Sequence, residues 1–566
     1  MPPKFDADLA KTYRGFVLRA LPGAQGYSDL RTDYAVALRI LLAITGLVLL
    51  IACANLANLM LARASARERE IAIRLAVGAS RGRLIRQLLA ESLLLSGAGA
   101  LAGAWIAATL NGRLVSYLGS RFGAVYLDLA PDWRMLGFTA ALAILASVFF
   151  GLTPALRATR TAPCTVMKAT SSGITTGRER FGLRRALVVT QVALSLVLLV
   201  GALLFVRSFR NLVSIDPGFR QDGILEADVD FSRLKLSADA THAFDRELIR
   251  RVTAIPGVDS AGHISIMPLS GSRWTEGVIV GNVQKGSTNF ERISPGYFGA
   301  MQTPLLAGRD FTDSDSANST KVAIVNQSFV RQYLDRGDPL GQTFRIPHNY
   351  APIACEVVGV VRDSKYVDIR EAFSPAAYLP TAQDPEPDSY LPVVIHSSLS
   401  PAALIPVLKR TLAAIHPGIG YEFHVFRDEV RQRLQREQLM ATLSGFFGIL
   451  AALLATIGLY GVMSYMVARR KNEIGIRLAL GAARGDVMRI VLREAALLLG
   501  LGIVAGTVIA LAATRAAGAL LFGLQPRDPE TFAFSIALLA TVAVAASWLP
   551  ARRAARLDPI AALREE

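Results

Sequence analysis

A glutamate and an arginine lie four residues apart in a segment that the chain contains twice. The first copy, residues 70–82 (EIAIRLAVGASRG), is identical at ten of thirteen positions to the second, residues 473–485 (EIGIRLALGAARG). An acid four residues before a base forms the favourable ion pair on a helix, and a following glycine ends or turns that helix. The residues with these roles are Glu70, Arg74 and Gly78 in the first copy and Glu473, Arg477 and Gly481 in the second. Their chemistry is charge pairing and surface recognition.

Each copy is expected to form an amphipathic helix along a membrane face, over residues 67–86 and 470–489. Ile71 and Leu75 belong to an apolar stripe, while arginines recur every seven residues. Two functions fit this pattern. A basic amphipathic helix can anchor in anionic lipid, but anchoring does not require a particular order of residues. The near-identical order of the two copies therefore favours docking to a protein surface.

Long apolar runs flank both copies and place them at the membrane. A helix needs about 20 apolar residues to cross the hydrocarbon core. The chain is 52% hydrophobic with a mean hydropathy of +0.38. The predicted spans are residues 41–62, 88–111, 135–154, 186–206, 439–467, 494–515 and 531–549. We therefore predict an α-helical integral membrane protein of about seven transmembrane helices in two related modules.

Positive charge is concentrated in alternate loops. Residues 63–87, 156–185 and 468–493 each contain seven Lys or Arg, whereas residues 112–134 and 516–530 contain three and one. If every run crosses the membrane once, the basic segments all fall on one side, which the positive-inside rule assigns to the cytoplasm. Both repeated segments are then cytoplasmic, and the expected location is the cell inner membrane.

The region between the fourth and fifth spans, residues 209–436, is polar. It contains 24 basic and 26 acidic residues, so the chain's net charge of +16 resides in the membrane part and predicts no nucleic-acid partner. Short β-like runs such as 321–326 and 356–361 alternate with helical patterns such as 243–255 and 401–415. We predict a mixed α/β extracytoplasmic domain of two lobes.

The two halves share a plan but differ at their beginnings. The second half consists of a span, the outer domain and three further spans, whereas the first half contains only three spans. Either the sequence begins late or a partner chain completes the first half. The expected domains are an extracytoplasmic remnant (1–34), a first membrane module (35–185), a transmembrane helix (186–208), the outer domain (209–436) and a second membrane module with a basic tail (437–566).

Several residues inside the spans have two interpretations. Asn55 and Asn58 fit hydrogen bonding between helices better than contact with a substrate. Two glutamates at the starts of spans fit interfacial ion pairs better than a role as intramembrane acids. The pairs are Glu91 with Arg86 and Glu494 with Arg489. The glycines that follow each copy are expected to let helices pack closely. They are Gly97, Gly99, Gly103, Gly500, Gly502 and Gly506.

Motifs for catalysis and cofactor binding are missing from the sequence. It contains no G-x-x-x-x-G-K-[ST] phosphate-binding motif, so ATP is expected on a partner subunit. Cys53, Cys164 and Cys355 fall in different compartments, which predicts no disulfide, and no metal-ligand spacing occurs. The six histidines are scattered. We expect no cofactor, no metal and no enzymatic activity in this chain.

Longer stretches carry a family resemblance. They are residues 50–92 (LIACANLANLMLARASAREREIAIRLAVGASRGRLIRQLLAES), 293–311 (ISPGYFGAMQTPLLAGRDF), 322–344 (VAIVNQSFVRQYLDRGDPLGQTF), 356–367 (EVVGVVRDSKYV) and 550–565 (PARRAARLDPIAALRE). Together they resemble the FtsX-like, MacB-type permeases of ABC transporters, and within these the acidobacterial duplicated orphan permeases. The resemblance covers nearly all of residues 13–566, although the first helix and first outer domain of that pattern are absent.

The resemblance implies a MacB-like periplasmic core domain and coupling helices that touch an ATPase. Carried over residue by residue, the coupling positions are Glu70, Arg74, Gly78, Glu473, Arg477 and Gly481. We therefore expect a permease subunit that transmits motion from a separate ATPase to the outer domain, for export or extraction of an unidentified substrate. Membrane lipid is a further partner, and a second permease chain or a periplasmic adaptor would complete the first half. The alternative is a signalling scaffold that regulates an extracytoplasmic partner without transport.

Overall fold

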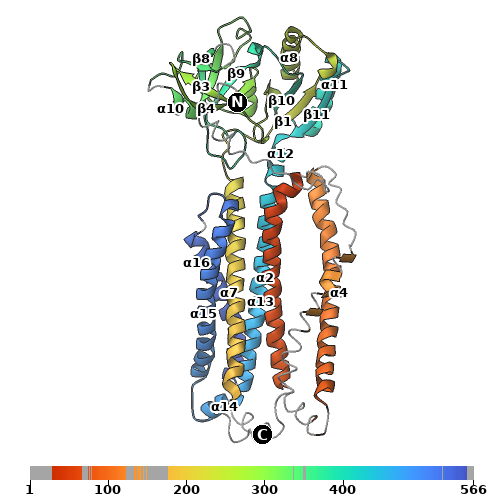
Figure 1. The fold of residues 1–566 in the computed structure, drawn as a ribbon, viewed down its shortest axis with the longest axis vertical. Helices are drawn as coiled ribbons and strands as arrows, with labels where there is room; N and C mark the ends of the chain where they lie inside the picture. The colour runs from red at the N-terminus through yellow and green to blue at the C-terminus, as the bar shows by residue number, and fades with distance from the viewer. Residues whose placement is uncertain are drawn as a thin grey trace, which may run out of the picture.

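The computed structural model describes residues 29–66, 81–122, 176–334, 337–347, 352–525 and 527–556, with single residues or short pieces within 74–80 and 133–148. Long helices form an upright bundle, and a β-rich head domain (residues 214–434) lies at one end of it (Figure 1). The other end of the bundle carries the short helix α14. The remnant expected at 1–34 and the basic tail after 556 fall almost entirely outside the described residues.

Six described helices are long and apolar enough to cross a membrane. They are α2 (Asp29–Ala66), α4 (Arg81–Phe122), α7 (Thr176–Val213), α13 (Gln435–Arg469), α15 (Arg484–Ala517) and α16 (Pro529–Ala555). Short helices complete the bundle: α14 (Lys471–Ala479) and η4 (Gly518–Leu520). The predicted fold class, an α-helical membrane protein with an α/β domain, is confirmed. The seventh expected span, 135–154, lies mostly outside the described residues.

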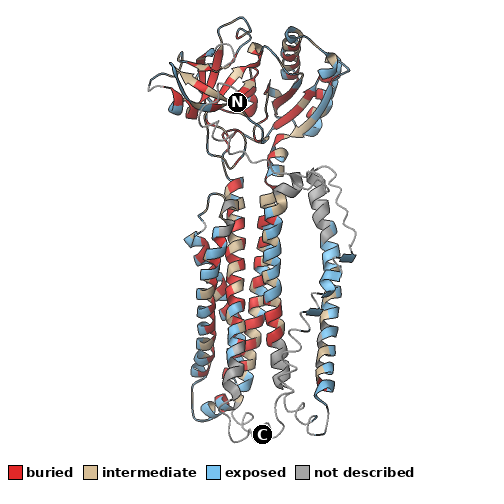
Figure 2. Ribbon diagram, viewed as in Figure 1, coloured by how far each residue is buried: buried red, intermediate tan, exposed pale blue. Residues whose placement is uncertain are grey.

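Helix α7 lies at the centre of the bundle, where Figure 2 shows buried residues along most of its length. It packs against α13 on one side and α15 on another. A methyl group at Gly502 would lie 2.5 Å from Val192, and one at Gly506 would lie 2.8 Å from the Ala193 carbonyl. These two glycines therefore allow α15 to approach α7 closely, as predicted.

Helix α4 of the first module differs from its counterpart in the second module, α15. No residue in the most apolar stretch of α4 is buried in the structure, and Figure 1 shows α4 standing apart from the other helices. A methyl group at three glycines of α4, or at one glycine of α15, would meet no described atom within 4 Å. These positions are Gly97, Gly99, Gly103 and Gly500. Close packing is therefore not seen at these four glycines among the described residues, and no described helix lies against α4 as α7 lies against α15.

The head domain contains a small antiparallel sheet in the order β11-β1-β10-β2. Its strands are β1 (Ile224–Asp230), β2 (Val258–His263), β10 (Tyr390–Ser397) and β11 (Gly420–Val425). Two amphipathic helices, α8 (Ala238–Thr253) and α11 (Pro401–Ile415), cover one face and share an apolar core with it. Because side chains alternate along a strand, every second residue of β1 points to the opposite face, toward the bundle and the second sheet.

The second sheet has seven strands in the order β5-β8-β6-β9-β4-β3-β7. The strands are β3 (Trp274–Val280), β4 (Val283–Ile293), β5 (Leu305–Gly308), β6 (Val322–Asn326), β7 (Thr343–Ile346), β8 (Ile353–Val361) and β9 (Ala376–Pro380). A further pairing of β7 with β8 closes six of them into a ring around an apolar core. The remaining short helices are η2 (Ser232–Leu234), α9 (Tyr297–Met301), α10 (Gln327–Tyr333) and η3 (Thr381–Gln383).

Two connections tie the head domain to the bundle. Helix α7 leads into β1, and β11 leads through α12 (Phe426–Arg433) into α13. Leu212 at the end of α7 and Phe426 and Val430 on α12 belong to the same buried cluster as Ile293 and Tyr378 of the second sheet. Since one continuous apolar core spans helix ends and both sheets, the head is packed onto α7 and α13 and is more than a tethered domain.

Candidate coupling site

The second copy of the repeated segment lies at the end of the bundle opposite the head domain (Figure 1). The expected single helix over 470–489 is wrong. Helix α14 ends at Ala479, and α15 begins at Arg484 after a tight turn. The segment is therefore a short helix along the bundle end followed by the first turns of a membrane helix.

Gly481 makes this turn, as the sequence predicted. Its φ of +91° lies in the left-handed region, which glycine adopts at little cost. The Gly481 N–H donates to the Leu478 carbonyl at 3.1 Å, and the Ala482 N–H donates to the Arg477 carbonyl at 3.0 Å. This pair of hydrogen bonds is the Schellman motif, which satisfies the last carbonyls of a helix.

A chain of ion pairs runs from α14 into the bundle. Arg477 pairs with Glu473 at 2.7 Å, as predicted, and Glu473 lies 3.9 Å from Arg470 at the end of α13. Arg470 also pairs with Glu494 of α15 at 3.3 Å, and Glu494 contacts Arg185 of α7. The network thus joins α14 to α7, α13 and α15.

The predicted partner of Glu494 is wrong. Arg489 precedes Glu494 on the same helix, but Arg470 and Arg185 reach the carboxylate from neighbouring helices. Glu494 is only 14% exposed, and two cations compensate for its partial burial. By contrast, Glu473 and Arg477 are about half exposed, and such a pair contributes only about 0.3–0.5 kcal/mol. The stability that this exposed pair contributes is therefore too small to explain its presence.

Helix α14 is amphipathic, with one face packed and one open. Ile474 is buried in the main cluster of the bundle, and Leu478 packs partly against it. On the other face, Ile476 is 48% exposed and Leu480 is 82% exposed, beside the Glu473–Arg477 pair. Exposed apolar side chains next to fixed charges form a surface suited to another protein or to the lipid interface.

The first copy has matching helix ends. Helix α2 ends at Ala66 and α4 begins at Arg81, each 403 positions before the end of α13 at Arg469 and the start of α15 at Arg484. Most of the expected helix over 67–86 lies outside the described residues, but its last part belongs to α4, which begins at Arg81 after the non-helical Ser80. The helix boundaries on either side of the repeated segment thus recur with the shift that the sequence shows.

A few residues of the first copy are described and can be compared with the second. Arg74 is helical, and its guanidinium donates to Gln87 at 3.4 Å. Val77 is 84% exposed, at the position equivalent to Leu480. Glu70 and Gly78 lie outside the described residues, so the Glu70–Arg74 pair stays a prediction.

Two amides hold α13 at the middle of the bundle. Asn55 of α2 and Gln191 of α7 both donate to the Leu454 carbonyl, at 2.8 and 2.7 Å. The predicted hydrogen bonding between helices is confirmed for Asn55, whereas Asn58 is buried without a hydrogen-bond partner in the described part of the chain. A methyl group at Gly458 would lie 2.5 Å or less from both amides. This amide clamp fixes α13 against α2 and α7.

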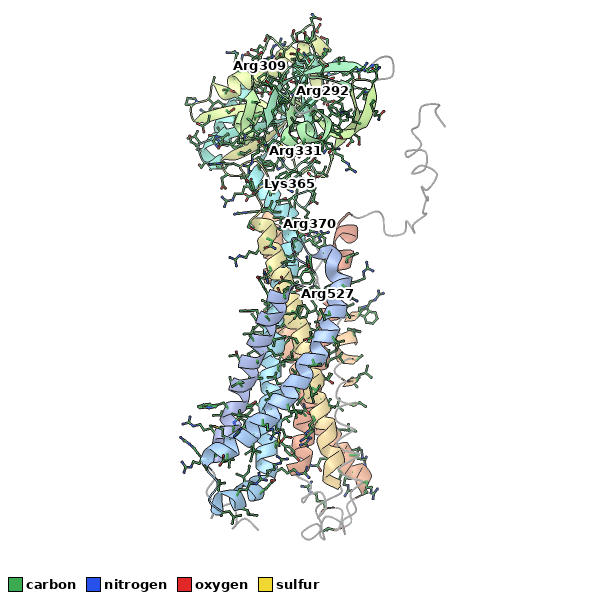
Figure 3. The ribbon with its side chains drawn as sticks, turned by 90° about the vertical axis from the view of Figure 1, so that its left-hand side faces the viewer. Arg292, Arg309, Arg331, Lys365, Arg370 and Arg527 are labelled. Atoms are coloured by element: carbon green, nitrogen blue, oxygen red, sulfur yellow. The ribbon has the colours of Figure 1, made fainter. Side chains whose placement is uncertain are left out.

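Ion pairs also connect the helices near the head domain. Arg370, which Figure 3 shows at the junction of head and bundle, pairs with Glu437 in the first turn of α13 at 2.5 Å. Arg207 of α7 pairs with Asp528 and Glu530 at 2.6 and 2.9 Å. Sequence reasoning missed these contacts, because their partners lie 67 to 323 positions apart without a local pattern.

The histidines and cysteines give no site among the described residues. His263 is buried against Asp245 at 2.8 Å, and no group of three or more His, Cys, Asp or Glu is arranged there to hold a metal ion. Cys53 and Cys355 are buried and unpaired. Cys164 lies outside the described residues.

Comparison with known proteins places these features in a family. The FtsX-like permease C-terminal model matches residues 42–163 and 445–559, and the MacB-like periplasmic core domain model matches residues 186–410. The chain is 31% identical over 324 residues to the pyoverdine export ATP-binding/permease protein PvdT of Pseudomonas syringae pv. tomato, covering 53% of this chain and 46% of PvdT. It thus spans about half the length of that relative.

Two further proteins are similar. The uncharacterized ABC transporter permease YknZ of Bacillus subtilis is 26% identical over 281 residues, covering 48% of this chain and 69% of YknZ. The crystal structure of the periplasmic region of MacB from Actinobacillus actinomycetemcomitans is 15% identical, with a TM-score of 0.28 over 40% of this chain and 98% of that one. The two family models together account for both membrane modules and most of the head domain, and the chain belongs to the FtsX-like, MacB-type family of ABC transporter permeases.

Proposed function

We propose that this chain is the permease subunit of an inner-membrane ABC transporter and that a separate cytoplasmic ATPase drives it. The ATPase docks on the two copies of the repeated segment, with Glu70, Arg74, Gly78, Glu473, Arg477 and Gly481 at the coupling positions. The chain itself has no catalytic activity in this proposal. The proposal is supported by the position of α14 in the second copy, and of the helix ends that flank the first copy, at the bundle end opposite the head. Each copy also has an exposed apolar side chain, Val77 or Leu480.

The contacts of α14 give the ATPase a mechanical connection to the membrane helices. A displacement of α14 acts on Arg470 and Glu494 through the ion-pair network and on the buried cluster through Ile474. Helix α13 is continuous from there to α12, and the amide clamp holds it beside α7. The head then moves with α7 and α13, because their ends share its core. Nucleotide binding would shift the population of head positions.

A charge-reversal experiment tests the docking. The purified chain and its co-purifying ATPase are compared for wild type, an Arg74→Glu/Arg477→Glu variant and an Arg552→Glu control. Arg552 lies in the last turn of α16 at the same bundle end but outside the repeat. The proposal predicts loss of ATPase recovery and of permease-stimulated ATP hydrolysis in the double variant alone.

Other results would count against docking. If the segment only anchored the chain in anionic lipid, ATPase recovery would not change and binding to anionic vesicles would weaken. Equal loss in the Arg552→Glu control would indicate a general charge effect. Vesicle transport assays with and without the ATPase then separate a transporter from a signalling scaffold, since only the former moves a solute.

A further inference from the structure

A cleft of about 200 Å³ opens in the head domain between the small sheet and α12. Figure 1 shows α12 directly below β1 and β11, at the junction with the bundle. Met267, Leu269, Phe426 and Val430 give the cleft an apolar floor. It is smaller than the roughly 300–1,000 Å³ of sites for drug-sized ligands. It therefore has room for a small molecule or for one end of a larger one.

A buried carboxylate faces this cleft without a partner. Glu226 of β1 is 9% exposed and lines the cleft, and no ion pair or hydrogen bond to its side chain occurs among the described residues. A buried ionisable group without a partner is costly, because it loses its hydration and gains nothing in return. Such a group is rare in a folded protein and calls for a role.

Further acids surround Glu226. Asp228 lies two residues along β1 on the same face, and Glu429 lies across the cleft on α12. His424, directly opposite Glu226 on β11, lies 3.4 Å from Glu429 and 3.7 Å from Asp228. One oxygen of Asp228 is buried without a hydrogen bond among the described residues. Among the described residues that line the cleft, Arg433 is the one arginine, against three carboxylates.

We propose that this cleft binds an organic cation, with the ammonium or guanidinium group of an amine-bearing molecule on Glu226 and its apolar part on the floor formed by Met267, Leu269 and Phe426. A cation supplies the hydrogen bonds and opposite charge that the carboxylate lacks. A metal ion fits less well, since Ca²⁺ takes six to eight converging oxygens and the described residues contain no such group. The site does not depend on the proposed ATPase docking.

Proton release provides a specific signature of this binding. Burial, together with Asp228 and Glu429 and opposed by Arg433, raises the pKa of Glu226 to about 8. The carboxyl is therefore mostly protonated at pH 7, and an ammonium group that binds it must displace that proton. The other titratable groups near it are His424, Tyr297 and Tyr390. Affinity should rise by about tenfold or more between pH 6 and 8, as the carboxyl ionises while the amine stays charged.

Calorimetry on the full chain in lipid nanodiscs tests the proposal, with 4-phenylbutylamine as the probe and empty nanodiscs as the blank. The neutral analogue 4-phenylbutan-1-ol tests the need for charge. Glu226→Gln removes the carboxylate, and Glu422→Gln on β11, whose side chain is 80% exposed, is the matched control. We expect Glu226→Gln to weaken amine binding about tenfold to a hundredfold and Glu422→Gln to leave it unchanged.

A second measurement keeps the test independent of the variants' folding. Titrations of the wild-type chain at pH 7 in two buffers of different ionisation enthalpy should show release of nearly one proton per amine bound. Absence of amine binding, equal binding of the alcohol, or binding without proton release would each overturn the proposal. So would full amine affinity in a folded Glu226→Gln variant, or tight Ca²⁺ binding that requires Glu226.

Discussion

Replacing Gly458 with alanine should loosen the amide clamp at the centre of the bundle. The new methyl group would lie 2.5 Å or less from the side-chain amides of Asn55 and Gln191. Real carbon atoms do not approach so closely, so both amides must move away from α13. The two hydrogen bonds to the Leu454 carbonyl, at 2.8 and 2.7 Å, are then lengthened or lost.

The expected cost follows from three effects. Hydrogen bonds between membrane helices contribute about 0.6 kcal/mol each on average. Overpacking of a close-packed interior costs about 1–3 kcal/mol. Alanine gains about 1 kcal/mol over glycine in a helix. We expect Gly458→Ala to lower the free energy of unfolding by about 1–3 kcal/mol.

The assay is reversible unfolding of the purified chain in mixed micelles, with Gly500→Ala as the matched control. Gly500 lies within α15, and a methyl group there would meet no atom within 4 Å. That control should be neutral or stabilising, because only helix propensity changes. A double-mutant cycle adds Gln191→Ala, which removes one obstructing amide and should reduce the cost of Gly458→Ala.

Two results would refute this reasoning. If Gly458→Ala were as stable as Gly500→Ala, the clamp would not hold α13 in the way that the contacts indicate. If the cost of Gly458→Ala were the same with and without the Gln191 side chain, the amide would not be the obstacle.

Three further predictions concern the coupling segment and the head. Gly481→Ala places an alanine in the left-handed backbone conformation, which costs about 1–2 kcal/mol, and should reduce ATPase recovery. Unchanged recovery would show that docking does not require the turn that ends α14. Phe426→Ala removes a side chain that is 1% exposed; it should destabilise the head by about 3–5 kcal/mol, and resistance of the head to proteolysis should fall accordingly. Burial raises the pKa of Glu291 to about 7, so its protonated form favours folding. Head stability should therefore decrease as pH rises from about 4.5 through 7, and Glu291→Gln should flatten that dependence in thermal unfolding; an unchanged profile would exclude Glu291 as its source.

The sequence was sufficient where local pattern determines structure. Apolar length places the six described membrane helices, and the four-residue spacing of Glu473 and Arg477 gives their ion pair. Gly481 ends α14 because glycine adopts the left-handed φ of a helix end at little cost, which is a property of the residue itself. The strands around 322 and 356 follow from their β-branched residues.

Tertiary contacts were not predictable in the same way. The partners of Glu494 come from two other helices, one of them more than 300 positions away. Glu226 sits at an ordinary strand position, and only folding places α12 over it to form the cleft. The glycines of α4 match those of α15 in sequence but lack a described packing partner, which no local pattern reveals.

Labelling of both repeated segments tests most directly whether they face the side opposite the head. Arg74→Cys and Arg477→Cys are made in a chain without its native cysteines, with Glu422→Cys in the head as the reference. A membrane-impermeant maleimide should label Glu422→Cys in intact spheroplasts, and should reach the other two only after permeabilisation. The proposed coupling would be contradicted if either repeat position were labelled in intact spheroplasts. It would also be contradicted if the two positions proved to lie on opposite sides of the membrane.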